Sequence, residues 1–346
     1  MDFSKEDLIW AAGEGVISPE QADHLWQKLQ ERGASSKKPK FDATNVAYYF
    51  GALVVMSAMG WLMNLGWERF GGIWIFFLAS CYAVVFVLAG RTLWHKENLA
   101  IPGGLLFTLA VWMTPLAIYG LERVTGVWPQ GAPANFQSYH IWIKGSWILM
   151  EVGTVVAGLI ALRFVRFPFL TFPIAFSLWY MSMDLTPLIV GKTEFTWRER
   201  LWVSLCFGLL ILLATYLIDR RTREDYAFWG YLFGLAAFWG GLSLMESSSE
   251  WKKFLYCLVN LGLIIVAVFL QRRVFLVFGA FGVFGYLGHL SYDVFKDSFL
   301  FPIVLSFLGL VVIYLGVQYQ RHREWFERAV LAVIPVAIRR LRPIER

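Results

Sequence analysis

The chain has 346 residues, of which 58% are hydrophobic and only 16% are charged. A water-soluble domain carries about 25% charged residues, so this chain has too little polar side-chain surface to cover a globule in water. The aromatic share of 18%, with 17 Trp and 30 Phe, is typical of chains whose aromatic rings anchor helix ends at the membrane surface. The composition therefore excludes an ordinary soluble protein and predicts an all-α integral membrane protein.

The first 40 residues are polar and precede the apolar part of the chain. Gly13 and Gly15 are expected to end a short first helix, and Ser18 opens the capping box "SPEQ", with Pro19 at the first helical position. The apolar residues of the second helix recur at i, i+3, i+4 and i+7, namely Ala22, Leu25, Trp26 and Leu29. We expect residues 1–40 to form a cytoplasmic helical hairpin and a basic linker. The apolar stripe of this hairpin is a candidate contact for a protein partner or a second copy of the chain.

Ten apolar segments are long enough to cross roughly 30 Å of hydrocarbon, which takes about 20 helical residues. They are residues 44–65, 71–91, 99–120, 146–163, 167–188, 200–218, 226–244, 252–270, 273–291 and 298–319. Residues 1–40 contain no apolar stretch followed by a cleavage site, so we expect the first span to act as the targeting signal. The sequence therefore predicts a bundle of about ten transmembrane helices within residues 41–320.

The distribution of Lys and Arg predicts the orientation of this bundle. With the N-terminus in the cytoplasm, 22 of the 31 Lys and Arg residues fall in cytoplasmic segments. The short turns "RFVR", "DRRTRED" and "QRR" all lie on that side. Positive charge concentrates in cytoplasmic loops, so both termini are expected to be cytoplasmic. The net charge of +6 is explained by positive residues in the expected cytoplasmic segments. We therefore expect no nucleic-acid partner.

Residues 321–346 predict a basic amphipathic helix that lies on the inner membrane surface. Apolar residues lie near one face, and Arg339 and Arg340 are among five arginines that supply the positive charge. The apolar stretch between the charged residues of this helix is too short to cross the membrane. Its arginines attract anionic lipid. We therefore expect the C-terminal helix to contact the lipid bilayer directly.

Acidic and polar residues collect at the expected outer ends of the spans. Glu151 lies about five residues inside the fourth span, in "WILMEVGTVVAGL", and Asp184 lies near the outer end of the fifth. Counting residues from the turn at 163–166 puts their carboxyl groups roughly 9 Å apart in depth at 1.5 Å per residue, so they need not touch. Other candidates on the same side are Glu122, Glu246, His289 and Asp293. Buried acids that handle a proton or cation fit this pattern, as does a carboxyl group bonded to a neighbouring helix.

Glycines and prolines indicate close packing and broken helices. Gly279, Gly282, Gly285 and Gly288 recur every third residue in the ninth span, which permits close approach of another helix. Prolines interrupt the third and fifth spans, at Pro102, Pro115, Pro168, Pro173 and Pro187. Broken helices often line substrate sites, although prolines also simply shape a bundle.

Sequence signatures of common enzymes are missing from the chain. It contains no H-E-x-x-H, G-x-S-x-G, Walker A or G-x-G-x-x-G motif, so no catalytic residue is proposed. The three cysteines, Cys81, Cys206 and Cys257, lack zinc spacing and fall in apolar runs. Only His289 among the five histidines lies in a span, which argues against a bis-histidine haem. We expect no cofactor and no metal site.

Three stretches carry a family resemblance. "GVISPEQADHL", "AIPGGLLFTLAVWMTPLAIYGLERVTGVWP" and "VRFPFLTFPIAFSLWYMSMDLTP" resemble the bacterial multi-pass membrane proteins grouped as domain of unknown function 2157. The resemblance implies a bacterial inner-membrane protein with an N-terminal helical hairpin. It implies no activity and no site residues.

Three functions are compatible with these features. The first is a transporter or channel for a small solute or ion, with a proton- or cation-handling carboxylate on the outer side. The second is a non-catalytic scaffold, sensor or complex subunit that recruits partners through Leu25, Trp26 and Leu29. The third, a membrane-embedded enzyme acting on lipid, has the fewest candidate residues. No sequence feature selects a substrate.

Overall fold

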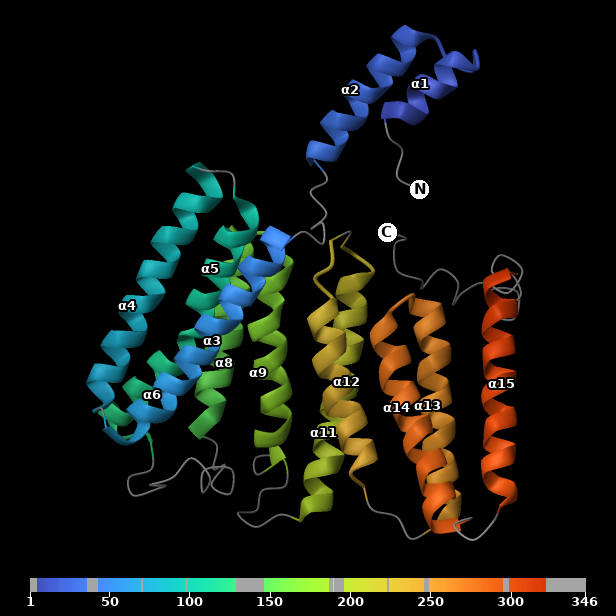
Figure 1. Cartoon of the computed structure of the whole chain (residues 1–346). Coiled ribbons are helices and arrows are strands. Elements are labelled where there is room, and N and C mark those ends of the chain that lie inside the picture. The colour runs from blue at the N-terminus through green and yellow to red at the C-terminus, as the bar shows by residue number, and fades with distance from the viewer. Residues whose placement is uncertain are drawn as a thin grey trace. The chain divides into compact units, whose positions relative to one another are not determined.

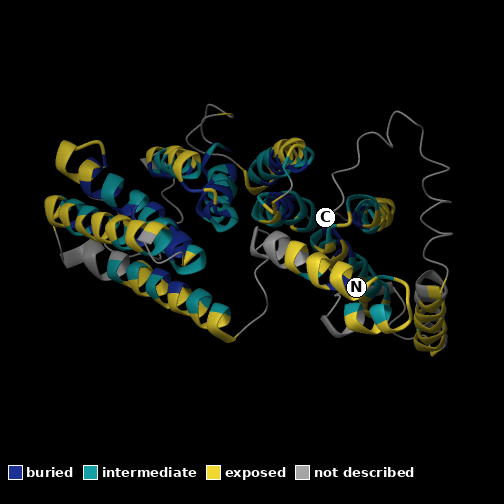
Figure 2. Cartoon of the chain, turned by 90° about the horizontal axis from the view of Figure 1, so that it is seen from above, coloured by how far each residue is buried: buried dark blue, intermediate teal, exposed yellow. Residues whose placement is uncertain are grey.

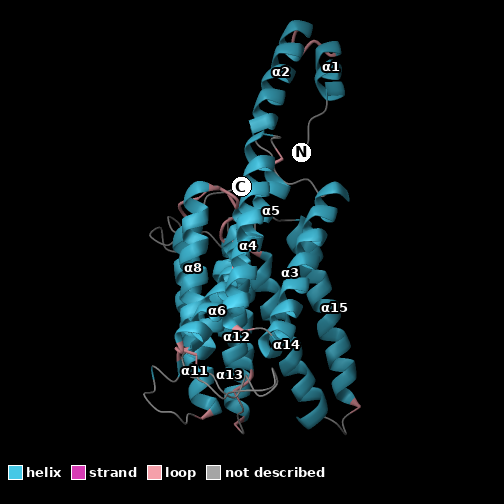
Figure 3. Ribbon diagram, turned by 90° about the vertical axis from the view of Figure 1, so that its left-hand side faces the viewer, coloured by secondary structure: helices cyan, strands magenta, loops and turns pink. Residues whose placement is uncertain are grey.

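The computed structural model describes residues 5–35, 43–69, 71–96, 99–128, 146–186, 189, 196–222, 224–245, 249–294 and 299–321. In these ranges the chain consists of helices and connecting turns and contains no strand (Figure 3). The chain forms two compact units, Met1–Val54 and Val55–Arg346, with their boundary inside the helix α3 (Ala43–Arg69). The all-α prediction is confirmed for the described residues.

The first unit contains a hairpin of α1 (Lys5–Gly13) and α2 (Pro19–Ser35), which pack against each other. The Ser18 hydroxyl accepts a hydrogen bond from the Gln21 backbone N–H at 3.1 Å, and the Gln21 side chain accepts one from the Ser18 N–H at 2.9 Å. These reciprocal bonds satisfy two amides at the start of α2 and confirm the predicted capping box.

The apolar stripe of α2 is only partly covered. Ala22 is buried, Trp26 is half-buried and Leu25 is exposed, while the side chain of Leu29 lies outside the described residues. Three further apolar side chains of the hairpin are exposed, namely Ile9, Trp10 and Val16. The hairpin is therefore too small to bury its own apolar residues.

The second unit is a helical bundle (Figure 1). Its helices after α3 are α4 (Gly72–Arg91), α5 (Ala100–Trp112), α6 (Thr114–Thr125), α8 (Ser146–Phe164), α9 (Thr171–Asp184), α11 (Trp197–Asp219), α12 (Phe228–Ser243), α13 (Glu250–Leu270), α14 (Arg273–His289) and α15 (Leu300–Arg321). Helix α4 packs against α5 and α6, α6 against α8, and α8 against α9. Helix α9 in turn contacts α11 and α12, and α12 contacts α14, which pairs with α13.

Within the described ranges, seven stretches are long and apolar enough to cross a membrane. They are Ala43–Leu62, Gly72–His95, Ala100–Thr125, Trp147–Phe164, Trp197–Asp219, Glu250–Leu270 and Arg273–Tyr292. In six of them no more than 22% of the most apolar window is buried, and Figure 2 shows the exposed faces in yellow. Apolar helices with so much exposed surface are typical of a multi-pass membrane protein, because lipid covers the faces that other helices leave open.

Three of the ten expected spans are not among these seven. The regions expected at 167–188 and 226–244 form α9 of 14 residues and α12 of 16 residues. Both helices are shorter than the roughly 20 residues that a straight span needs. The region expected at 298–319 forms α15, which has 22 residues. The number of ten spans therefore stays a prediction.

The predicted glycine row of α14 is a packing surface only in its first half. A Cβ atom at Gly279 would lie 2.7 Å from the backbone oxygen of Asn260 in α13, and one at Gly282 would overlap the Asn260 side-chain amide. Equivalent atoms at Gly285 and Gly288 would meet no heavy atom within 4 Å. Close approach of α13 and α14 thus depends on two of the four glycines.

The side chain of Asn260 occupies the space that Gly282 leaves open between α13 and α14. Its side chain is fully buried, accepts a hydrogen bond from the Trp239 indole N–H at 3.0 Å and donates one to the Tyr256 backbone oxygen at 2.8 Å. A satisfied amide of this kind ties α12 to α13 inside an apolar bundle.

Replacing Gly282 by alanine is expected to destabilise the bundle, because the new methyl group overlaps the Asn260 amide. Overpacking of this kind costs about 1–3 kcal/mol. The matched control Gly285→Ala adds the same methyl group into open space and replaces a helical glycine, so it should be neutral or slightly stabilising. Thermal unfolding of both variants in detergent measures the difference, and equal midpoints would contradict the packing described.

Candidate functional site

The central pair of polar residues in the bundle is Glu151 of α8 and Asp184 of α9. Their residues are 5% and 1% exposed, and the two side chains lie close enough for their charges to interact. Glu151 lies thirteen residues before Phe164 at the end of α8, and Asp184 lies thirteen residues after Thr171 at the start of α9. In an antiparallel pair of helices, equal distances from the connection place two residues at the same level.

The sequence-based expectation that these carboxyl groups differ in depth by about 9 Å is therefore wrong. A difference of 9 Å would require the chain after residue 166 to be a continuous α-helix that rises 1.5 Å per residue. In the structure, residues 165–167 are not helical, Pro168–Leu170 forms a short 3₁₀ turn, and α9 begins only at Thr171. The later start moves Asp184 down by several residues and opposite Glu151.

Both carboxyl groups lack conventional partners. In the part of the chain that the structure describes, neither oxygen of Glu151 or Asp184 has a hydrogen-bond partner at bonding distance and angle. The Thr186 hydroxyl, two residues after Asp184, is also buried without a partner. A buried polar group left unpaired costs about 1–3 kcal/mol, so a natural sequence rarely retains several together without an occupant that satisfies them.

Two other side chains adjoin the carboxyl pair. Arg200, in the first turn of α11, lies close enough to Asp184 for their charges to attract. The phenol of Tyr180, one helical turn before Asp184, is close enough to be influenced by both carboxyl groups. With both acids ionised, the pair and Arg200 carry a net charge of −1.

Glu151 also borders a cavity of about 300 Å³ that lies within the second unit. Aromatic and methionine side chains form most of its wall, namely Trp112, Trp147, Phe176, Tyr180, Met59, Met113 and Met150. Pro115 also lines it, near the break at Met113 that divides the expected third span into α5 and α6. Proline cannot continue the helical hydrogen bonds, so the predicted interrupted helix does border the cavity.

The remaining predicted site residues are not gathered at this pair. Glu122 is buried at the end of α6, and its two carboxyl oxygens likewise have no hydrogen-bond partner among the described residues. His289 contacts Glu250 at 3.0 Å and Lys253 at 3.1 Å, where α13 begins and α14 ends. Asp293 lies in the π-helical turn Leu290–Val294, and its side chain is outside the described residues.

Other predicted residues lie beyond what the structure describes. Arg339 and Arg340 of the expected surface helix, and Glu246, are outside the described ranges. In those ranges, no three His, Cys, Asp or Glu side chains form a group that fits a metal ion. The three cysteines are free thiols, with Cys257 buried and the other two exposed.

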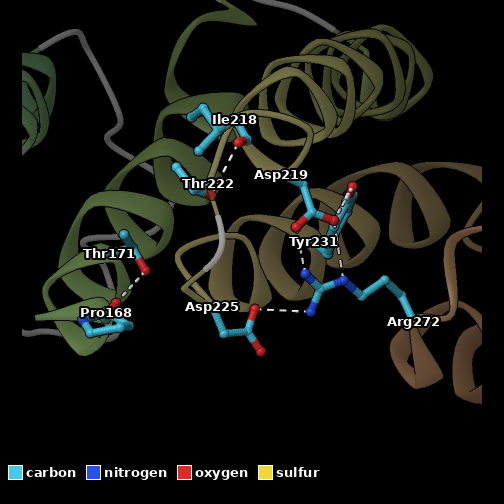
Figure 4. A network of polar contacts seen from close by, with 8 residues as sticks. All are labelled: Pro168, Thr171, Ile218, Asp219, Thr222, Asp225, Tyr231 and Arg272. Carbon is cyan, nitrogen blue, oxygen red and sulfur yellow. Dashed lines mark hydrogen bonds and ion pairs between the residues drawn. The ribbon is translucent and has the colours of Figure 1, made fainter. Parts of the chain in front are cut away.

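The structure also reveals an ion-pair network that the sequence did not indicate (Figure 4). Arg272, between α13 and α14, donates to the two Asp219 oxygens at 2.5 and 3.2 Å and to Asp225 at 2.9 Å. Tyr231 donates to Asp219 at 3.2 Å, and the guanidinium lies over its ring. Burial alone would lower the pKa of Arg272, but hydrogen bonds and charges of the two aspartates raise it above its usual value.

This network joins the end of α11 to the turn before α14. The sequence shows Arg272 as one of several arginines in the basic turns, and nothing in its spacing selects it as the partner of Asp219. The Asp219 side chain is fully buried and that of Arg272 is 14% exposed. Such a bidentate pair fixes the relative positions of two helical hairpins.

Removing Asp219 should destabilise the bundle much more than removing Asp225. Asp219→Ala leaves the largely buried guanidinium without its bidentate partner, which typically costs about 3–5 kcal/mol. Asp225 is half-exposed and its ion pair is screened by solvent, so Asp225→Ala should cost about 0–1 kcal/mol. Thermal unfolding in detergent distinguishes the two, and similar losses would show that burial does not set the strength of this network.

Comparisons with known proteins identify no relative of this chain. No protein-family model, no curated protein and no solved structure matches it. The resemblance to domain of unknown function 2157 therefore stays a prediction.

Proposed function

We propose that this protein moves a small solute or ion across a membrane, with Glu151 and Asp184 as its proton- or cation-handling groups. The observation that carries the proposal is the pair of buried, facing carboxyl groups without hydrogen-bond partners beside a cavity. In a multi-pass bundle, ionisable groups that face the interior commonly mark an ion or substrate pathway.

Either a proton or a monovalent cation can neutralise the excess negative charge of such a pair. Two close carboxyl groups share a single proton readily, because the charge of one carboxylate opposes ionisation of the other. A monovalent cation neutralises the same charge when the proton leaves, since Arg200 already compensates one of the two acids. Proton and cation then compete for one site, which is the basic requirement for coupled exchange.

Replacing the acids tests this proposal. Proteoliposomes that enclose a pH-sensitive dye are expected to lose an imposed pH gradient faster with the protein than without it. Glu151→Gln and Asp184→Asn should each reduce that rate at least tenfold, because the neutral amide cannot carry the proton. The control Glu224→Gln removes an exposed acid elsewhere in the bundle and should leave the rate unchanged. An unchanged rate in both site variants would overturn the proposal.

We further propose ten spans with both termini in the cytoplasm of a bacterial cell, in its inner membrane. Support comes from the 22 of 31 Lys and Arg residues that this arrangement puts on the cytoplasmic side. The short helices α9 and α12 are flanked by helices on either side of the bundle, so they can cross a locally thinner region.

Cysteine labelling tests this topology. Single cysteines are introduced at residues 37 and 346 and in the 129–145 segment of a variant without its three natural cysteines. A membrane-impermeant maleimide applied to intact cells should label only the cysteine in 129–145, because the other two face the cytoplasm. Labelling of residue 346 but not of residue 37 without cell lysis would require an odd number of spans, and labelling of both would reverse the proposed orientation.

A second candidate function is a scaffold or complex subunit that binds partners through its N-terminal hairpin. Its support is the exposure of Ile9, Trp10, Val16 and Leu25 on a unit too small to bury them. Glu151→Gln and Asp184→Asn separate the two functions, since a scaffold has no need of either carboxyl group.

A further inference from the structure

The cavity beside Glu151 has a mainly aromatic and methionine lining, which indicates the kind of ligand that it binds. Four aromatic side chains line it, from α5, α8 and α9, and neighbouring rings contact one another. The ring centroids of Trp147 and Tyr180 are 6.2 Å apart, those of Phe176 and Tyr180 5.2 Å, and those of Trp112 and Phe176 5.1 Å. The cavity thus has a continuous aromatic wall with one unpartnered carboxyl group, that of Glu151, on its border.

We infer that this cavity binds a small organic monocation, such as a quaternary ammonium ion. Aromatic faces attract cations through their quadrupole, and the attraction strengthens where water is excluded. Glu151 borders the same wall and supplies the matching negative charge once the proton shared with Asp184 has left. The inference rests on the proposed function, because it names the class of cation that the site handles.

The charge of the site supports a monocation over other ligands. Glu151, Asp184 and Arg200 together carry −1 when both acids are ionised, so one positive charge makes the site neutral. An anion would meet this charge, and the described residues that line the cavity include no basic side chain to offset it. A neutral apolar molecule would leave the carboxyl pair unsatisfied.

The same lining argues against a hydrated or fully coordinated inorganic ion. Hard cations such as Mg²⁺ and Ca²⁺ need about six or more oxygen ligands. Beyond Glu151, the described residues of the wall that carry a side-chain oxygen are Thr154, Ser177 and Tyr180, and the Thr154 hydroxyl already donates to the Met150 backbone oxygen at 2.7 Å. Three methionines in the wall are polarisable and adapt their shape, which suits an organic ion.

The size of the cavity sets the size of the ligand. Its volume of about 300 Å³ lies at the lower end of the range of small-molecule pockets, about 300–1,000 Å³. An ion of about ten non-hydrogen atoms, with one aromatic ring and one charged head, fits this space. Benzyltrimethylammonium has these properties, and its carbon isostere neopentylbenzene has the same shape without the charge.

Calorimetric titration of the purified full-length protein in detergent tests the inference. Benzyltrimethylammonium should bind, and neopentylbenzene should bind at least tenfold more weakly because only the charge differs. Glu151→Gln and Trp147→Leu should each weaken binding of the cation at least tenfold, while the exposed-acid control Glu224→Gln should not. Thermal unfolding of each variant checks that it remains folded. The Trp147 variant keeps the carboxyl pair, so it tests the aromatic wall separately.

The outcomes distinguish this inference from the proposed transport. Equal affinity for the cation and its neutral isostere, unchanged affinity in both folded variants, or no binding of the cation would overturn the organic-cation site. Cation binding without any flux would keep the site and overturn transport. Flux without cation binding would keep transport and overturn this inference.

Discussion

The antiparallel packing of α8 against α9 is the constraint on which the arrangement of the bundle depends. Helices α5 and α6 contact α8, while α11 and α12 contact α9, so this hairpin connects the two sides of the second unit. Its connection is short and contains the 3₁₀ turn Pro168–Leu170, which fixes how far α9 is shifted along α8. A change in that shift by one helical turn would move Asp184 about 5.4 Å away from Glu151.

The buried acids of the bundle differ in their hydrogen-bond partners. Asp219 accepts hydrogen bonds from Arg272 and from Tyr231, and these bonds neutralise its charge and join the helices. Glu151 and Asp184 lie beside Arg200 and Tyr180, but their carboxyl oxygens have no hydrogen-bond partner among the described residues. A buried charge with a complete set of partners is a structural element, whereas an incomplete set leaves room for a proton or ligand to bind.

Several features of the candidate site follow from local sequence. Glu151 stands out because a carboxyl group in an apolar run needs a partner, and Pro115 marks the helix break because it lacks an N–H. The aromatic wall could not be found in the same way. Trp112, Trp147 and Phe176 are three among many aromatic residues, and their meeting depends on how α5, α8 and α9 pack.

The sequence by itself determined the helical membrane class, the capping box at Ser18 and the identity of the two central acids, because composition, local hydrogen bonding and the cost of buried charge are properties of short segments. Only the tertiary structure decided that Glu151 faces Asp184, that Asp219 is the partner of Arg272, and that Gly282 rather than Gly285 makes room for Asn260. Those outcomes depend on the shift and rotation of whole helices against one another, which a single irregular turn is enough to change.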